Sequence, residues 1–259
     1  MTVLFSIEDH VARVTIDRAD RMNAVDEATA DRLEEIWQSI EANNDVRVVV
    51  LTGDGEKAFS AGADMKAGGS SKSGLAYWED ARKGGFGGLA TRRSLHVPVI
   101  ARVNGLAVGG GFEMVLGCDI VVAAEHASFG LPEARVGRMP LDGGMIILPR
   151  MIPQKIAMAM MLTGNRISAQ DAMNYGVVNE VAAAGELDAV VDRWVKQILK
   201  CAPLSVKAIK ESVKETIDLP IDEAKALCLP SLVAALESED GDEGPSSFRE
   251  KREPVWKGR

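Results

Sequence analysis

The sequence predicts an α/β protein in which a core of alternating strands and helices precedes a helical C-terminal region. Along the first half, the apolar patterns run strand, helix, strand, loop, strand, helix, an order typical of parallel sheets with right-handed crossovers. Beyond Pro149 the patterns are mostly helical. The length of 259 residues suits one large domain with an appendage, so we predict a core over residues 1–200 and a helical region over residues 201–259.

The first predicted elements are a hairpin, a helix and a buried strand. Residues 3–8 and 12–17 are strand candidates, and the second of them alternates apolar and polar side chains. Asp26 is the expected N-cap of a helix whose apolar residues recur at helical spacing. The β-branched run over residues 46–53 predicts a strand that is buried on both faces and ends at Gly53.

The middle of the chain alternates glycine-rich segments with regular elements. Residues 66–74 and 83–88 are rich in small residues, and we expect mobile flaps there that hold no packed element. Residues 75–82, between the flaps, predict a short helix. A strand is expected over residues 97–105, and residues 112–125 pass from helical to strand-like character.

The second half predicts helices with one short strand between them. Ser168 is the expected N-cap, and Gly176 the terminator, of the second of these helices. The helices are expected over residues 153–164, 168–176, 186–200, 205–216, 221–236 and 244–252, and the strand over residues 177–181.

Composition excludes several classes of protein. The net charge of -8 argues against recognition of nucleic acid, which depends on clustered cations. No apolar run approaches the roughly 20 residues that span a bilayer, and the first ten residues lack the basic start and apolar run of a secretory signal. The three cysteines lie far apart with only three histidines to assist them, so no metal site is expected. We expect a cytoplasmic protein with no membrane partner.

Two glycine-containing loops are candidates for anion binding. "SAGAD" (residues 60–64) and "VGGGFE" (residues 108–113) each follow a strand candidate and offer unobstructed backbone N–H groups. If the second loop opens a helix, its first N–H groups have no partner within the helix. One amide from each loop would make an oxyanion hole, where a lost donor typically costs roughly 3 kcal/mol of transition-state stabilisation. Tight turns alone would also explain the glycines.

Glu113 and Glu133 have ordinary explanations when each is considered alone. Acidic residues are common in the first turn of a helix, which is the expected position of Glu113. Glu133 stands in a segment bounded by glycine and proline, where a carboxylate is most often plain surface.

Several ordered motifs resemble the crotonase (enoyl-CoA hydratase/isomerase) superfamily, from the first strand to the last helix. These motifs are "KAFSAGADMK", "PVIARVNGLAVGGGFEMVLGCDIVVA", "ASFGLPEARVG", "LTGNRISAQDAMNYGVVNEV" and "FREKREPVWKGR". The resemblance implies a spiral of repeated ββα turns with a helical C-terminal region that packs subunits into trimers, or into hexamers as paired trimers. It is strongest to a branch of the superfamily that acts on a carnitine-type acyl group.

The resemblance also implies the roles of individual residues. The N–H groups of Ala63 and Gly110 would bind the thioester oxygen, and glycine at positions 110 and 111 would leave room for the thioester to approach. Glu113 and Glu133 would flank a 2-enoyl-CoA, one activating water for attack at C3 and the other giving a proton to C2. The CoA moiety is part of the substrate and not a separate cofactor. The resemblance implies that it contacts Ala61, Asp64, Met65, Lys66 and, from a neighbouring subunit, Lys251.

One position departs from the family pattern. Leu141 stands where many hydratases have a small residue and where some isomerases or dehydratases carry aspartate, and Asp142 follows it. Asp142 would be an extra acid–base group or, as we favour, a loop cap, because aspartate is common in turns. Tyr77, Trp78 and Phe86 are candidates to enclose the acyl group or simply to anchor a flap or a trimer contact.

The resemblance therefore implies an enzyme that adds water reversibly to a 2-enoyl-CoA, without a metal or a redox cofactor. An isomerase or lyase on the same fold would use the oxyanion hole without needing both glutamates. A non-catalytic acyl-CoA-binding subunit is the alternative of another class.

Overall fold

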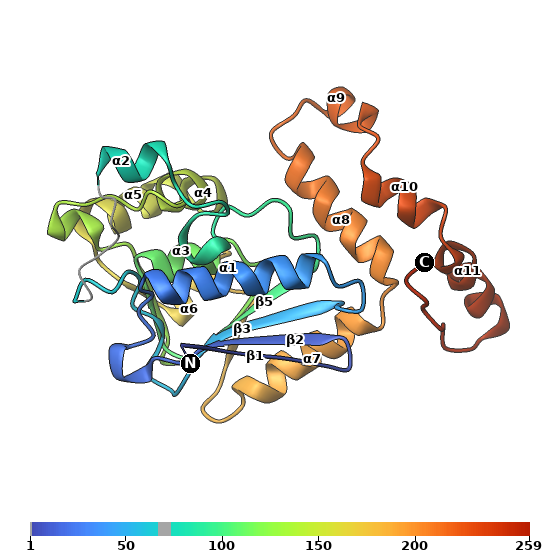
Figure 1. Ribbon diagram of the computed structural model, residues 1–259, viewed down its shortest axis with the longest axis horizontal. Coiled ribbons are helices and arrows are strands. Elements are labelled where there is room, and N and C mark those ends of the chain that lie inside the picture. Colours follow the sequence, from blue (N-terminus) through green and yellow to red (C-terminus); the bar gives the residue numbers. More distant parts are fainter. Residues whose placement is uncertain (1, 67–73) are drawn as a thin grey trace.

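The core of the molecule is a six-stranded sheet with the order β1-β2-β3-β5-β7-β10 (Figure 1). The computed structural model describes residues 2–66 and 74–259. β1 and β2 form the predicted antiparallel hairpin, and every other neighbouring pair in this sheet is parallel. The strands are β1 (Val3–Glu8), β2 (Val11–Ile16), β3 (Val48–Gly53), β5 (Val99–Val103), β7 (Ile120–Ala124) and β10 (Glu180–Ala182).

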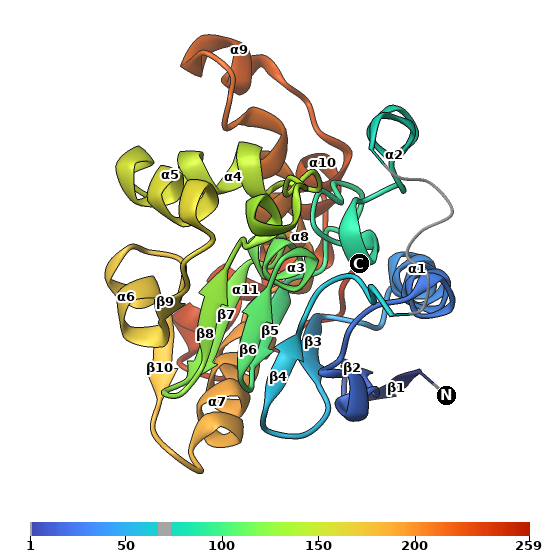
Figure 2. The same ribbon diagram turned by 90° about the vertical axis from the view of Figure 1, so that its left-hand side faces the viewer.

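A second sheet of four short strands lies beside the first, with the order β4-β6-β8-β9 (Figure 2). Each of β3, β5 and β7 is followed along the chain by one strand of this second sheet, so successive turns give a strand to each sheet. This is the spiral that the motifs implied. No strand was expected at these four positions, because two or three residues are too few to show the alternation of apolar and polar side chains that is typical of a strand. The strands are β4 (Ala58–Ser60), β6 (Leu106–Val108), β8 (Ser128–Gly130) and β9 (Ile167–Ser168).

Helices cover the two sheets, and most of them were predicted. Asp26 caps α1 as expected, its Oδ1 accepting from the Thr29 N–H at 2.9 Å. Ser168 caps α6 through a capping box with Asp171. The helices of the core are α1 (Glu27–Glu41), α2 (Leu75–Glu79), α3 (Gly110–Leu116), α4 (Gly144–Met151), α5 (Gln154–Thr163), α6 (Ala169–Asn174) and α7 (Leu187–Leu199), with the 3₁₀ turns η1 (Ala19–Arg21), η2 (Phe86–Gly88) and η3 (Glu133–Val136).

The central strand β3 is buried on both faces, as its composition predicted. Val49 and Leu51 pack into the larger apolar cluster, which includes α1 and the second sheet. Val48 and Val50 face a smaller cluster in which Val191 of α7 packs against the opposite side of the sheet. The two clusters hold β3, β5 and β7 in place, and the candidate site lies in the loops after β4, β6 and β8, the short strands that follow them along the chain.

Two expectations for the loops of the core are wrong. Residues 83–88 were expected to hold no packed element, yet the last three of them form η2, in which Gly87 and Gly88 are buried. The part of the other predicted flap between residues 67 and 73 lies outside the described residues. No helix was expected over residues 144–151, but α4 forms there and includes Pro149. Burial of Gly144 and Leu148 against the core holds this short helix in place.

The C-terminal region is helical, as predicted, and extends to one side of the sheets (Figure 1). Its helices are α8 (Pro203–Thr216), α9 (Ile221–Ala226), α10 (Pro230–Leu236) and α11 (Glu239–Glu250). The segment predicted as one helix over 221–236 is divided, because Leu229, which precedes a proline, is extended. α8 is tied to the core by Lys210, whose Nζ donates to Asp119 Oδ2 at 2.6 Å and to Val97 O at 2.7 Å. The boundary at residue 200 stays a prediction. Among the described residues, no helix is both long and apolar enough to cross a membrane.

Candidate active site

The two glycine-containing loops meet in the structure. A Cβ placed on Gly62 would lie 3.0 Å from Gly110 N and 2.9 Å from Val108 O. The first loop is held on its other side by a parallel bridge between Val25 and Ala63. In this bridge the Val25 N–H donates to Gly62 O at 2.8 Å and the Asp64 N–H donates to Val25 O at 3.0 Å. The spatial contact that sequence spacing alone did not establish is therefore present.

The geometry leaves the amides of Ala63 and Gly110 available to a ligand. The bonds of the bridge use the N–H groups of Val25 and Asp64, so the Ala63 N–H stands outside that ladder. Gly110 is the first residue of α3, where a backbone N–H has no acceptor within the helix. Their assignment as an oxyanion hole stays a prediction.

The glycines at positions 110 and 111 have different neighbours from those expected. A Cβ on Gly111 would lie 2.2 Å from Ser60 O, so Gly111 allows α3 to pack against β4. A Cβ on Gly110 would lie 2.5 Å from the ring of Phe86. The position that a Cβ would take on each of these two glycines is therefore occupied by protein atoms, which is a packing reason for both glycines. Their role in leaving room for the thioester stays a prediction.

Glu113 is buried on α3 and is held by a loop that comes later in the chain. The residue is only 3% exposed. Its Oε1 accepts hydrogen bonds from the backbone N–H groups of Asp142 and Gly144, both at 2.9 Å. Its Oε2 has no hydrogen bond to the described residues. Burial, with the charges of Asp142 and Glu133, raises the pKa of Glu113 to about 8, although the two amide donors oppose this rise.

Glu133 lies on η3 at the same end of α3. A Cβ on Gly109, the residue that precedes α3, would lie 3.1 Å from Glu133 Oε1. Glu133 Oε2 is buried and has no hydrogen-bond partner among the described residues. Burial raises the pKa of this carboxyl. The structure thus brings Glu113 and Glu133 together at the start of α3. Glu113 stands in the first turn, as expected, but is buried there, and Glu133 is partly buried and not plain surface.

Asp142 is not the loop cap that we favoured. The N-cap of α4 is Gly143, which forms no side-chain cap bond, and Asp142 is only 6% exposed. Its Oδ2 accepts from the hydroxyl of Tyr77 at 2.5 Å. Burial raises the pKa of Asp142, against the effect of the bonds from Tyr77 and the backbone of Phe86. No sequence signal could have shown this pair, because its two residues are 65 positions apart.

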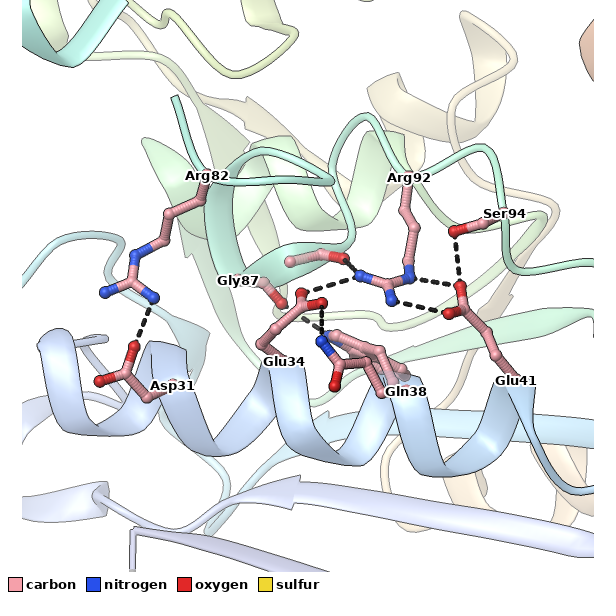
Figure 3. A network of polar contacts seen from close by, with 10 residues as sticks. Asp31, Glu34, Gln38, Glu41, Arg82, Gly87, Arg92 and Ser94 are labelled. Carbon is pink, nitrogen blue, oxygen red and sulfur yellow. Dashed lines mark hydrogen bonds and ion pairs between the residues drawn. The ribbon is translucent and has the colours of Figure 1, made fainter. Parts of the chain in front are cut away.

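The segment that contains Phe86 is fastened to α1 by a polar network (Figure 3). Arg92, only 2% exposed, donates from Nε and Nη2 to the two oxygens of Glu41 at 2.7 and 2.9 Å, and from Nη1 to Glu34 at 2.8 Å. Nearby, Trp37 Nε1 donates to Gly87 O at 2.7 Å. These contacts fix the position of η2 and with it the ring of Phe86 beside Gly110.

The other acyl-pocket candidates lie at different depths. Trp78 on α2 is 48% exposed, whereas Phe86 and Leu141 are partly buried. Phe86 alone of these three lies against a proposed oxyanion-hole residue, Gly110. The enclosure of an acyl group by these side chains stays a prediction.

The candidate CoA contacts divide into buried and exposed residues. Asp64 is buried, and its Oδ2 accepts from Arg18 at 2.8 Å, so this side chain braces the loop. Met65 and Lys66 are exposed, and Ala61 is partly buried. Lys251 follows α11, which Figure 1 places at the opposite end of the molecule from α2. Its predicted role depends on a neighbouring subunit.

The comparisons identify the family that this fold and site define. The chain belongs to the enoyl-CoA hydratase/isomerase family, whose model matches residues 6–259. It is 42% identical over 253 residues to a carnitinyl-CoA dehydratase of Salmonella heidelberg (strain SL476), covering 96% of this chain and 95% of that relative. The carnitinyl-CoA dehydratase of Escherichia coli (strain SMS-3-5 / SECEC) matches with the same identity and coverage. These relatives belong to the carnitine-related branch that the sequence motifs resembled.

Solved structures agree with this assignment. The enoyl-CoA hydratase of Bacillus anthracis superimposes with a TM-score of 0.89 at 33% identity, covering 100% of both chains. The enoyl-CoA hydratase of Mycobacterium tuberculosis H37Rv gives a TM-score of 0.88 at 32% identity, covering 100% of this chain and 99% of that one. The predicted crotonase-like fold is therefore confirmed.

Proposed function

We propose that this protein adds water reversibly to a 2-enoyl-CoA thioester, with Glu113 and Glu133 as the acid–base pair. The observation that carries the proposal is the placement of buried Glu113 and partly buried Glu133 at the start of α3, beside Gly110, whose N–H has no acceptor within the helix. Both carboxyl groups have a raised pKa, and the proposal requires them to share one proton when substrate is bound. Addition of water needs one proton acceptor and one proton donor, which a singly protonated pair supplies.

In the proposed reaction, the N–H groups of Ala63 and Gly110 stabilise the negative charge that develops on the thioester oxygen. Glu113, as carboxylate, takes a proton from water while the water oxygen bonds to C3. Glu133, as carboxylic acid, gives its proton to C2, so the pair ends with its proton on the other glutamate. Elimination of water is the reverse of these steps.

The pKa of Glu113, raised to about 8, keeps a proton on this carboxyl in the free protein at neutral pH, so the proposed roles require that proton to lie on Glu133 once substrate is bound. Hydrogen bonding supports this division of roles. Glu113 Oε1 accepts two amide donors, which favours the charged form, and its Oε2 has no hydrogen bond to the described residues and could hold the water. Glu133 Oε2 has no donor among the described residues, which favours the neutral acid. The expectation that no metal or redox cofactor takes part belongs to the same proposal.

For the substrate, we propose a carnitine-type enoyl-CoA. The support is the 42% identity to carnitinyl-CoA dehydratases over nearly the whole chain. Tyr77, Phe86 and the carboxylate of Asp142 near Glu113 are also groups of the kind that stabilise a quaternary ammonium. A short aliphatic enoyl-CoA is the competing substrate.

The test follows loss of the conjugated thioester's absorbance with crotonyl-CoA and crotonobetainyl-CoA in parallel. We expect Glu113→Gln and Glu133→Gln each to lower kcat by roughly 10²- to 10⁴-fold, while Glu125→Gln, at an exposed glutamate, keeps full activity. Full activity in one of the two site variants would favour an isomerase or lyase that works through a single carboxylate. Tight binding of acyl-CoA without turnover by the unchanged protein would favour the non-catalytic alternative.

We also propose that the chain assembles into trimers, or into hexamers as paired trimers. The proposal is supported by a row of exposed apolar side chains that runs from Ile209 and Val213 of α8 to Ile217, just after this helix, and to Ile221 of α9. Covering such a row with a second copy removes apolar surface from water. A partner subunit would also be needed for Lys251 to approach CoA.

A further inference from the structure

Asp142 joins three segments that are distant in the sequence. Its backbone N–H donates to Glu113 Oε1 at 2.9 Å, and its Oδ2 accepts from the Tyr77 hydroxyl of α2 at 2.5 Å. A Cβ on Gly85 would lie 3.3 Å from Asp142 Oδ1, at a backbone φ of +70° that favours glycine. The carboxylate thus occupies the junction of α2, the segment before η2 and the loop that holds Glu113.

The burial of this carboxylate is costly and brings no ion pair. No cation pairs with Asp142 among the described residues, and the charge of Asp142 acts on Glu113. Burial and Asp142 raise the pKa of the Tyr77 hydroxyl, and the opposing effect of Arg82 is smaller. Arg82 itself pairs with Asp31 at 2.5 Å. A buried polar group without a cation usually destabilises a fold relative to an apolar one. The buried carboxylate of Asp142 is therefore better explained by a contribution to the site that contains Glu113 than by a contribution to the stability of the fold.

We propose that Asp142 and Tyr77 are positioning residues for Glu113. The hydrogen bond from Tyr77 fixes the Asp142 side chain, and through it the loop over residues 141–144 whose two N–H groups hold Glu113 Oε1. Docking of α2 and orientation of the general base are thereby coupled. The catalytic consequence rests on the proposed function, whereas the coupling itself does not.

The first experiment removes one hydroxyl. Tyr77→Phe should lower kcat on the order of 10- to 100-fold, because a small displacement of a catalytic group is costly, with KM changed less than kcat. Tyr175→Phe is the matched control, since Tyr175 lies at the end of α6 and packs against the core. We expect it to keep both constants. Equal kcat values in the two variants would overturn the proposal.

The second experiment observes Glu113 directly, without enzymatic turnover. The carboxyl carbon of Glu113 is followed by NMR in protein labelled at glutamate and assigned with Glu113→Gln. Asp142→Asn removes a negative charge that raises the pKa of Glu113, so the titration should move to lower pH. Asp192→Asn, on the surface beside Arg13, should leave it unchanged.

The two experiments separate the two proposals. A shifted Glu113 titration in a protein that hydrates neither substrate would support the coupling and reject the proposed function. An unshifted titration in Asp142→Asn would overturn the coupling even in an active hydratase. If Asp142→Asn does not fold, the Glu113 titration in Tyr77→Phe, compared with Tyr175→Phe, decides the same question.

Discussion

Gly62 and Gly110 lie so close together that a Cβ on Gly62 would stand 3.0 Å from the amide nitrogen of Gly110. The two residues come from loops that follow different strands, β4 and β6, and these strands are neighbours in the second sheet. Because the strands pair in parallel, their carboxyl ends meet at one edge, and both loops leave from that edge. The proposed oxyanion hole depends on this contact.

Gly62→Ala should therefore disturb the site as well as the backbone. The added methyl would press on Gly110 N and Val108 O at a φ of +81°, so we expect kcat to fall by roughly 10²-fold or more if the oxyanion hole is displaced. Gly176→Ala is the matched control, because Gly176 has a φ of +88° and no atom within 4 Å of the added Cβ. It should cost stability of about 1–2 kcal/mol without affecting kcat. A similar loss of kcat in both variants would contradict the prediction.

The rate of hydration should fall at alkaline pH. The negative charge of Glu133 contributes to the raised pKa of Glu113, about 8. This pKa therefore refers to a state in which Glu133 is already ionised, so titration of Glu113 removes the last proton from the pair. Since the reaction needs one proton on the pair, kcat/KM should decline as pH rises through about 8. The reaction releases no net proton, so hydration and dehydration must show the same profile. Initial rates in both directions between pH 6 and pH 10 provide the check, and a rate that rises steadily through this range would reject the role of the pair.

Glu113 should also make stability depend on pH. Its pKa lies above the ordinary value of 4.5, so the folded protein retains a proton that the unfolded chain releases between pH 4.5 and about 8. The contribution of this group to stability therefore decreases as pH rises through that window. Urea denaturation at pH 6 and pH 8 should show a smaller decrease for Glu113→Gln than for the unchanged protein. Equal decreases would show that Glu113 ionises normally in the folded state.

Arg92 and Arg93 should differ greatly in their contributions to stability. Arg92→Met removes a buried guanidinium and leaves Glu34 and Glu41 without their cation, which should cost about 3–5 kcal/mol. Arg93→Met breaks an exposed pair with Glu215 and an exposed hydrogen bond to Lys214 O, and should cost less than about 1 kcal/mol. Urea denaturation of the two variants measures both values. Similar costs would mean that the network in Figure 3 adds little to the fold.

Assembly should depend on the exposed apolar row that runs from α8 to α9. Ile217 is 74% exposed, and Ile217→Glu would place a charge in the proposed subunit contact. We expect this variant to sediment as a smaller species than the unchanged protein. Leu4→Glu, at an exposed leucine of β1, should leave the assembly intact. A monomeric unchanged protein in analytical ultracentrifugation would reject the proposed trimer.

Some elements could be predicted because their causes are local. The hairpin alternates side chains along two adjacent strands, and α1 carries its cap at Asp26 and its apolar stripe within one segment. The glycine-containing loops and the two glutamates were found through motifs that lie within short stretches of sequence. These features are continuous in the chain, so the sequence alone was sufficient to predict them.

Other features were decided only by the tertiary structure. Strands β4, β6, β8 and β9 have two or three residues each, too few for a period, and exist because neighbouring strands pair with them. The sequence favoured a loop cap at Asp142, whereas in the structure its carboxylate accepts a hydrogen bond from Tyr77, which is 65 positions away. Residues 83–88 show no packing pattern in the sequence, but in the structure Gly87 O accepts a hydrogen bond from Trp37, which is 50 positions away. Such contacts depend on how separate segments pack, and no local pattern in the sequence records that packing.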